Sequence, residues 1–187
     1  MTWIVLAALA ALALLVVGMY NALVRLKVQS ENAWADIDVQ LKRRYDLIPN
    51  LIETVKGYAS HEKQTLDAVI TARNRAMSAT TPSSKAEAEG ILAQSLKSLF
   101  ALAEAYPQLR AVESFNQLQG SLNQIEEAIQ NARRYYNAVV RDLNTKIQEF
   151  PSNFIATFFS FKPREFFEIT AAAERAVPKV SFEQTLR

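Results

Sequence analysis

The sequence predicts an all-α fold, in which an N-terminal transmembrane helix is continuous with a long antiparallel four-helix bundle, followed by an irregular aromatic C-terminal tail. The chain of 187 residues contains only four glycines, and the helix-favouring residues alanine, leucine, glutamate, glutamine and arginine are abundant. Its first 20 residues include a long uncharged segment, and apolar residues then recur at alternating spacings of three and four. We therefore divide the chain into an anchor (1–20), a bundle (21–150) and a tail (151–187).

Residues 3–20 form the uncharged segment, which reads WIVLAALAALALLVVGMY. As a helix it is about 27 Å long, enough to cross the hydrocarbon core of a bilayer. Trp3 and Tyr20 stand at its ends, where interfacial aromatic residues are typical. A cleaved signal peptide is the alternative, but no lysine or arginine precedes the segment and no convincing cleavage site follows it. Basic residues follow the segment, so the downstream domain is expected in the cytoplasm and the N-terminus outside.

After the anchor the helix is expected to continue without interruption, because its apolar face is regular. This face comprises Leu23, Leu26, Ser30, Ala33, Ile37 and Leu41. The chain is then expected to turn at Asp46-Leu47-Ile48-Pro49 into a helical hairpin, with Asp46 as the cap and Pro49 in the first turn of the next helix. One long helix kinked at Pro49 is the alternative, since an internal proline removes one backbone hydrogen bond.

The second helix is expected to carry two charged residues, Glu62 and Arg73, on its buried face. That face comprises Ile48, Ile52, Val55, Ala59, Glu62, Leu66, Val69, Arg73 and Ala76. Charged side chains in such positions need polar partners. We interpret them as a structural polar layer that sets the register of the bundle, in preference to a functional site.

Two further helices complete the predicted bundle. The first is expected to begin with the capping box Ser84-Lys85-Ala86-Glu87 and to end at Pro107, burying Ile91, Leu92, Leu96, Leu99, Leu102 and Tyr106. The next is expected to begin with a second capping box at Ser114 and to run until Pro151. Its apolar face is the most regular of all: Phe115, Leu118, Leu122, Ile125, Ile129, Ala132, Tyr136, Val139, Leu143, Ile147 and Phe150.

Several long runs in these helices resemble one protein family. They are YNALVRLK from Tyr20, AWADIDVQLKRRYDLIPNLIETVKGYASHE ending at Glu62, LFALAEAYPQLRA from Leu99, FNQLQ from Phe115, ARRYYNAVVRDLN from Ala132 and FPSNFIA from Phe150. Together they resemble the LemA family of bacterial membrane proteins over residues 20–167. The resemblance implies a single N-terminal helix in the bacterial inner membrane, an outward N-terminus and a cytoplasmic helical bundle. It implies little about biochemical role.

The tail is rich in phenylalanine, with eight of the ten phenylalanines between Phe150 and Phe182. Prolines interrupt it, so it is not a single helix. Its rings either fold back over one end of the bundle, or dock on a neighbouring subunit or the lipid interface. The candidates for oligomer or interface contacts are Phe154, Phe158, Phe159, Phe166 and Phe167.

The residues needed for most catalytic and metal sites are missing. The chain has one histidine, His61, and no cysteine, which excludes a two-histidine zinc motif and a Cys/His nucleophile pair. No nucleophile elbow or phosphate-binding glycine motif occurs. We therefore expect no cofactor, no metal and no enzymatic activity. His61 and Glu62 are interpreted as a pair at the edge of the buried face in preference to a proton-transfer site.

The charge pattern gives little support for nucleic-acid binding, because a net charge of +2 lacks the strongly basic surface that such proteins use. The short basic run Lys42-Arg43-Arg44 is expected on a solvated face or in salt bridges between subunits. The expected partners are therefore the lipid membrane and further copies of the chain.

Two functional hypotheses remain from the sequence. The first is a membrane-anchored scaffold that self-associates and organises the membrane or its proteins. The second is a signalling or adaptor module that binds and modulates a membrane enzyme, such as a protease or kinase. The size of the protein in mild detergent separates them, since the first requires a discrete homo-oligomer.

Overall fold

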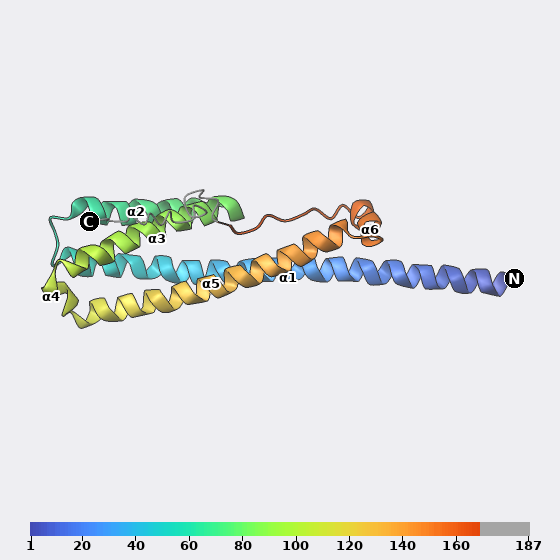
Figure 1. Cartoon of the computed structure of the whole chain (residues 1–187), viewed down its shortest axis with the longest axis horizontal. Helices are drawn as coiled ribbons and strands as arrows, with labels where there is room; N and C mark the ends of the chain where they lie inside the picture. Colours follow the sequence, from blue (N-terminus) through green and yellow to red (C-terminus); the bar gives the residue numbers. More distant parts are fainter. Residues whose placement is uncertain (169–187) are drawn as a thin grey trace, which may run out of the picture.

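The computed structural model describes residues 1–168, and within these residues it contains six helices and no strand. The all-α prediction is therefore confirmed. The longest helix, α1, runs from Thr2 to Lys56 and has 55 residues, so it is about 80 Å long. Its first part projects alone beyond the other helices, and its second part lies among them (Figure 1).

The two parts of α1 differ sharply in exposure. Large apolar side chains in the first part are exposed, for example Trp3 at 82% and Leu14 at 73%. Leu23, Ile37 and Leu41 in the second part are fully buried. An 18-residue window of high mean hydropathy near the N-terminus has none of its residues buried. The first part is thus long and apolar enough to cross a membrane, and it continues into the bundle without a break.

Helix α1 passes through Pro49, so the expected turn at residues 46–49 was wrong and the long-helix alternative was right. Proline has no N–H to donate to the carbonyl four residues earlier, which is that of Tyr45. Nε of Arg73 lies 2.9 Å from this Tyr45 oxygen and donates to it in place of the proline. The chain turns instead after α1, between Gly57 and Glu62.

The bundle consists of two helix pairs. Helix α5 (Glu113–Gln148) lies along the second part of α1, and α2 (Lys63–Ser78) lies along α3 (Pro82–Glu104) (Figure 1). Buried side chains from all four helices form one apolar core. Successive helices run in opposite directions, as their short connections require.

The helix starts differ from the predicted capping boxes. Helix α3 begins at Pro82, and its cap is Thr81, whose hydroxyl accepts from the N–H of Ser84. Ser84 is therefore the third residue of the helix and not its cap. Helix α5 begins at Glu113 without a side-chain cap, so the expected cap at Ser114 was also wrong.

Most predicted core positions are buried or partly buried, and two are exposed. Along α5 the buried residues are Phe115, Leu122, Ile129, Tyr136, Val139, Val140 and Leu143. The apolar face ends before Phe150, which lies beyond the helix and is 79% exposed. On α3, Ile91 is 38% exposed, because Glu89 and small alanines occupy the buried positions of that turn.

Two short helices connect or follow the long ones. Helix α4 (Pro107–Arg110) links α3 to α5 at the end of the bundle farthest from the N-terminus. Helix α6 (Ser152–Phe158) lies at the opposite end and contacts both α1 and α5 (Figure 1). From Phe161 the chain extends without helical structure to Glu168. The tail prediction for residues 169–187 lies outside the described residues.

Candidate functional site

A buried polar cluster lies in the middle of the bundle around Arg44. Its Nη1 atom donates to Oε2 of Glu89 on α3 at 3.1 Å, and both side chains are less than 10% exposed. Its Nη2 atom lies 3.0 Å from Oε2 of Glu126 on α5, as an ion pair without the alignment of a hydrogen bond. The hydroxyl of Tyr45 donates to Oε1 of Glu89. One arginine therefore connects α1, α3 and α5.

Burial changes the proton affinity of this cluster. Removal from water raises the pKa of the Glu89 carboxyl, and the hydrogen bond from Tyr45 and the charge of Arg44 oppose that rise only in part. Burial also raises the pKa of the Tyr45 hydroxyl, and the adjacent Glu89 carboxyl adds to the rise. Arg44 and Tyr45 thus offset only part of the desolvation of Glu89, as is common for buried ion pairs.

The cluster borders a cavity of about 230 Å³ between α3 and α5. Arg44, Glu89 and Glu126 line it together with Lys97 and Arg133. At the edge of the cluster, Nζ of Lys85 lies 3.1 Å from Oδ1 of Asp38. With both signs of charge in mutual contact, the cluster fixes how the helices align and leaves little net charge for a ligand.

The sequence reasoning missed this cluster and predicted a solvated or inter-subunit position for Lys42-Arg43-Arg44. Lys42 and Arg43 are exposed, but Arg44 is 7% exposed inside the monomer. The spacing contained the signal: Leu41 follows Ile37 by four residues, and Arg44 and Tyr45 follow Leu41 by three and four, so all of them lie on the buried face of one helix. Because a turn was predicted at residues 46–49, the buried face of this helix was not extended to Arg44.

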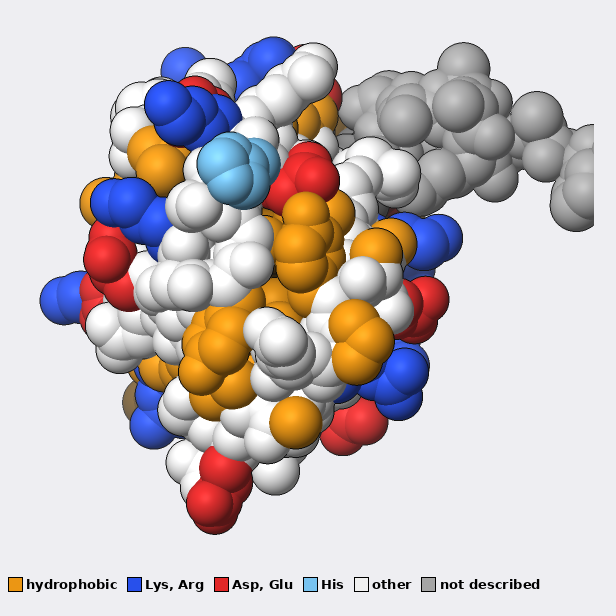
Figure 2. Space-filling view, turned by 90° about the vertical axis from the view of Figure 1, so that its left-hand side faces the viewer, with side chains coloured by type: hydrophobic (Ala, Val, Ile, Leu, Met, Phe, Trp, Pro, Cys, Tyr) orange, Lys and Arg blue, Asp and Glu red, His pale blue; other side chains and the backbone are white. Residues whose placement is uncertain are grey.

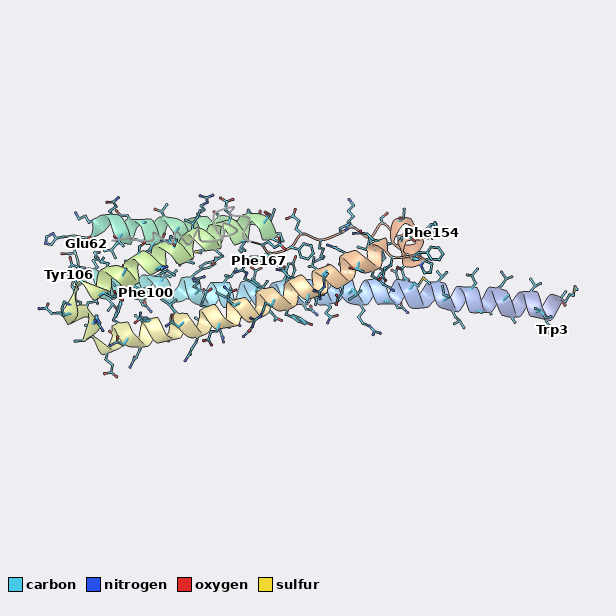
Figure 3. The ribbon with its side chains drawn as sticks, in the orientation of Figure 1. Trp3, Glu62, Phe100, Tyr106, Phe154 and Phe167 are labelled. Carbon is cyan, nitrogen blue, oxygen red and sulfur yellow. The ribbon has the colours of Figure 1, made fainter. Side chains whose placement is uncertain are left out.

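The two predicted seam residues each contact another element. Arg73 satisfies the Tyr45 carbonyl beside Pro49, as described above. The hydroxyl of Tyr106, just after α3, donates to Oε1 of Glu62 at 3.1 Å, and this hydrogen bond raises the pKa of the Tyr106 hydroxyl. Figure 3 shows Glu62 and Tyr106 close together at the loop end of the bundle. The structure therefore places Glu62 and Arg73 at separate points and not in one layer.

The surface at this loop end is mixed. Figure 2 shows hydrophobic side chains gathered near the centre of the end face, with charged side chains around them and the single histidine exposed beside them. Within residues 1–168, no group of three or more histidine, aspartate or glutamate side chains is placed to hold a metal ion.

The start of the tail is fastened to α5 by a ladder of hydrogen bonds. The side-chain amide of Asn144 donates to the carbonyl of Arg164 and accepts from its N–H, both at 2.9 Å. Asn137 makes the same pair of bonds with Phe167, at 3.1 and 2.9 Å. Between them, the Tyr136 hydroxyl donates to the carbonyl of Glu165 at 2.8 Å. The backbone of residues 164–167 is thus held along α5 by hydrogen bonds to side chains of that helix.

This ladder explains part of the motif ARRYYNAVVRDLN, in which Tyr136, Asn137 and Asn144 stand. Sequence reasoning used only its apolar positions. Two asparagines seven residues apart lie on one face of a helix and each offers both a donor and an acceptor, so the spacing was the available signal.

The five phenylalanines predicted as interface contacts separate into two groups. Phe167 is 1% exposed in the monomer core, where its ring lies 5.8 Å from that of Trp34 and under the guanidinium of Arg133. It therefore cannot contact a neighbouring subunit, and Phe166 is partly buried beside it. The other three are exposed: Phe154 at 65%, Phe158 at 81% and Phe159 at 47%.

The helical fold and the exposed apolar helix indicate the class: a membrane-associated helical protein. Comparison with known families makes this specific. The model of the LemA family matches residues 33–182, so the chain belongs to the LemA family.

Relatives of known name fall into two kinds. Magnetosome protein MamQ 1 and MamQ 2 of Paramagnetospirillum magneticum are each 30% identical over 90 residues, which cover 48% of this chain and 33% of the relative. Protein LemA of Metamycoplasma hominis is 26% identical over 141 residues, covering 75% of this chain and 64% of the relative. The alignment thus spans about one third of each of those MamQ proteins.

Proposed function

We propose that this chain is a self-associating scaffold of a bacterial inner membrane that acts through its surfaces and not through catalysis. The observation that carries the proposal is the unbroken helix α1, which joins an exposed apolar span to the bundle core. No flexible linker lies between them, because residues 21–41 are helical and their inward side chains are buried. The bundle is therefore held in one orientation relative to the membrane.

This stiff connection lowers the entropic cost of association. Copies confined to one membrane and held in one orientation need to lose less freedom to pack side by side than copies that meet in solution. Such packing forms a closed ring when the rotation that relates neighbouring copies divides a full turn evenly. A closed homo-oligomer with its bundles parallel is the expected assembly.

The relatives support a role at a membrane. Three of them are magnetosome proteins of the MamQ type, and the fourth is Protein LemA. None of these names describes an enzymatic activity. They support a structural role for this chain but leave its partner open.

The proposed orientation rests on charge. Arg25 and Lys27 follow the apolar span closely, which favours a cytoplasmic bundle and an outward N-terminus. The chain has no cysteine, so Thr2→Cys and Ser83→Cys each give a single labelling site. In intact spheroplasts an impermeant reagent is expected to label the first and not the second. Labelling of Ser83→Cys alone would reverse the topology.

Sedimentation of the full chain in mild detergent tests the assembly. A discrete species at a fixed multiple of 21.0 kDa is expected. Inserting a flexible glycine-serine segment between Tyr20 and Asn21 should reduce that species, because it uncouples the bundle from the anchor. An insertion of seven helix-forming residues at the same point is the control, since two turns preserve stiffness and phase. A monomer that sediments only with another protein would favour the adaptor hypothesis.

A further inference from the structure

The end of the bundle nearest the apolar span is marked by aromatic contacts. Tyr20, the last residue of the uncharged segment, lies with its ring 4.7 Å from that of Phe159 and 5.9 Å from that of Phe161. Because Tyr20 ends the hydrocarbon-spanning length, these contacts place α6 and the residues after it at the level of the membrane surface.

One face of α6 is apolar and uncovered. Phe154 and Phe158 lie one turn apart and are 65% and 81% exposed, whereas Ser152 and Ala156 are buried against the bundle. The ring of Phe150 packs on that of Phe154 at 6.0 Å. In Figure 3, Phe154 projects from the side of α6 that faces along α1 toward Trp3. The ring of Phe154 thus points toward the region that the membrane would occupy.

A cavity of about 570 Å³ lies between α1 and residues 159–164, which directly follow α6. Its apolar wall includes Tyr20, Val24 and Phe159, and its polar wall includes Lys27, Glu31, Lys162 and Arg164. Nη2 of Arg164 is paired with Oε1 of Glu31 at 2.5 Å. Among the described residues no carboxylate forms an ion pair with Lys27 or Lys162.

The depth of Lys27 matches the headgroup layer. Lys27 follows Tyr20 by seven residues, about 10 Å along α1. The headgroup layer adds about 5–8 Å beyond each face of the hydrocarbon core. Side chains on a helix lean toward its N-terminus, and a long lysine extends its ammonium further in that direction. The ammonium group therefore reaches the level of lipid phosphates.

We propose that this end of the bundle is a lipid site, in which α6 inserts Phe154 and Phe158 into the interfacial layer and the cavity binds the phosphate of an anionic phospholipid through Lys27 and Lys162. The apolar wall then contacts the upper part of the acyl chains. The proposal requires the anchor to span the membrane but does not depend on self-association.

Lipid retention tests the headgroup site. The full chain is reconstituted in bilayers of equal phosphatidylglycerol and phosphatidylcholine, extracted with mild detergent, and its retained lipid is quantified. Wild type should retain more phosphatidylglycerol than phosphatidylcholine. The ratio of the two retained lipids should fall about fivefold for each lysine that is replaced, so the variant Lys27→Gln with Lys162→Gln should lose the excess. Lys42→Gln with Arg43→Gln removes the same charge from exposed sites on α1 and should retain it. Lys27→Arg with Lys162→Arg should retain it as well.

Equal loss in both glutamine variants would show attraction by net charge only and would overturn the site. Displacement of the retained lipid by inorganic phosphate would assign the cavity to free anions instead. The sedimentation of these variants is measured separately, so failure of the lipid site is distinguishable from failure of the scaffold.

A spin label tests the insertion of α6. Phe158→Cys, labelled with a nitroxide in a chain that has no other cysteine, should be more accessible to oxygen than to a water-soluble nickel complex. Tyr58→Cys, at an exposed position just after the far end of α1, is the matched control and should show the reverse. Equal behaviour of the two labels would place α6 in water and overturn the insertion.

Discussion

The middle of the bundle and its end nearest the apolar span, the proximal end, contain the same kinds of side chain in opposite settings. In the middle, Arg44 and Arg73 are removed from most water, and each meets a protein oxygen at 3.1 Å or less. At the proximal end, Lys27 and Lys162 are exposed beside a cavity, and the rings of Phe158 and its neighbours are uncovered.

This difference separates residues that stabilise the fold from exposed residues that can contact another molecule. A buried cation must be paired, because an isolated charge in a core costs more than the fold can supply. An exposed cation or ring contributes little to stability and is free to meet another molecule. Substitutions at the two ends should therefore differ in size and in what they change.

Arg44→Ala should have the largest effect. It leaves Glu89 and Glu126 without their shared cation inside the bundle, and loss of one partner of a buried pair costs about 3–5 kcal/mol. Chemical unfolding of the full chain in detergent, followed by far-UV circular dichroism, measures the change. Arg43→Ala is the control, since Arg43 is exposed and its loss should change stability by less than about 0.5 kcal/mol. Similar losses in both variants would mean that the Arg44 cluster is hydrated.

Arg73→Ala should have the next largest effect. It leaves the Tyr45 carbonyl beside Pro49 without a donor, at a cost of about 1–3 kcal/mol. In the Pro49→Ala background residue 49 regains an N–H that bonds the same carbonyl, so Arg73→Ala should then cost distinctly less. The double-mutant cycle measures this coupling. Additive effects would show that Arg73 acts elsewhere.

The pH dependence of stability should reveal Glu89. Its folded pKa lies above the ordinary value of 4.5, so between 4.5 and the raised pKa the folded chain holds a proton that the unfolded chain has released. The free energy of unfolding contributed by Glu89 is therefore greatest below pH 4.5 and falls as the pH rises through that window. Glu89→Gln should lack this fall when unfolding midpoints are compared across the window. A wild-type stability that rises with pH relative to that of Glu89→Gln would give Glu89 a lowered pKa instead.

The sequence was sufficient for elements whose signal is periodic. The apolar span, the continuation of α1 and the buried faces of α2 and α5 follow from spacing alone, since one face of a helix must be apolar to be buried. The outcome at Pro49 was not predictable in this way. It depends on Arg73, which lies 28 residues after Tyr45 and donates to the Tyr45 carbonyl the hydrogen bond that Pro49 cannot make.

The candidate sites were harder to predict for the same reason. The side chains of Asn137 and Asn144 bond to the backbone of residues 164–167, so their role shows only once the tail is placed along α5. The phenylalanines of the tail could not be sorted by composition either. Phe158 lies at the end of α6 and is exposed, whereas Phe167 lies in the stretch that runs along α5 and is buried.

The smallest effect on stability is expected from Phe154→Ser combined with Phe158→Ser. Both rings are more than half exposed in the folded chain, so their loss should change the free energy of unfolding in detergent by less than about 0.5 kcal/mol. Phe167→Ala is the matched comparison, because it removes one phenyl ring from the core and should cost about 3–5 kcal/mol. Chemical unfolding of both variants under one condition gives the two values. If the double serine variant lost as much stability as Phe167→Ala, the rings of α6 would be part of the core, and the contrast between the two ends of the bundle would disappear.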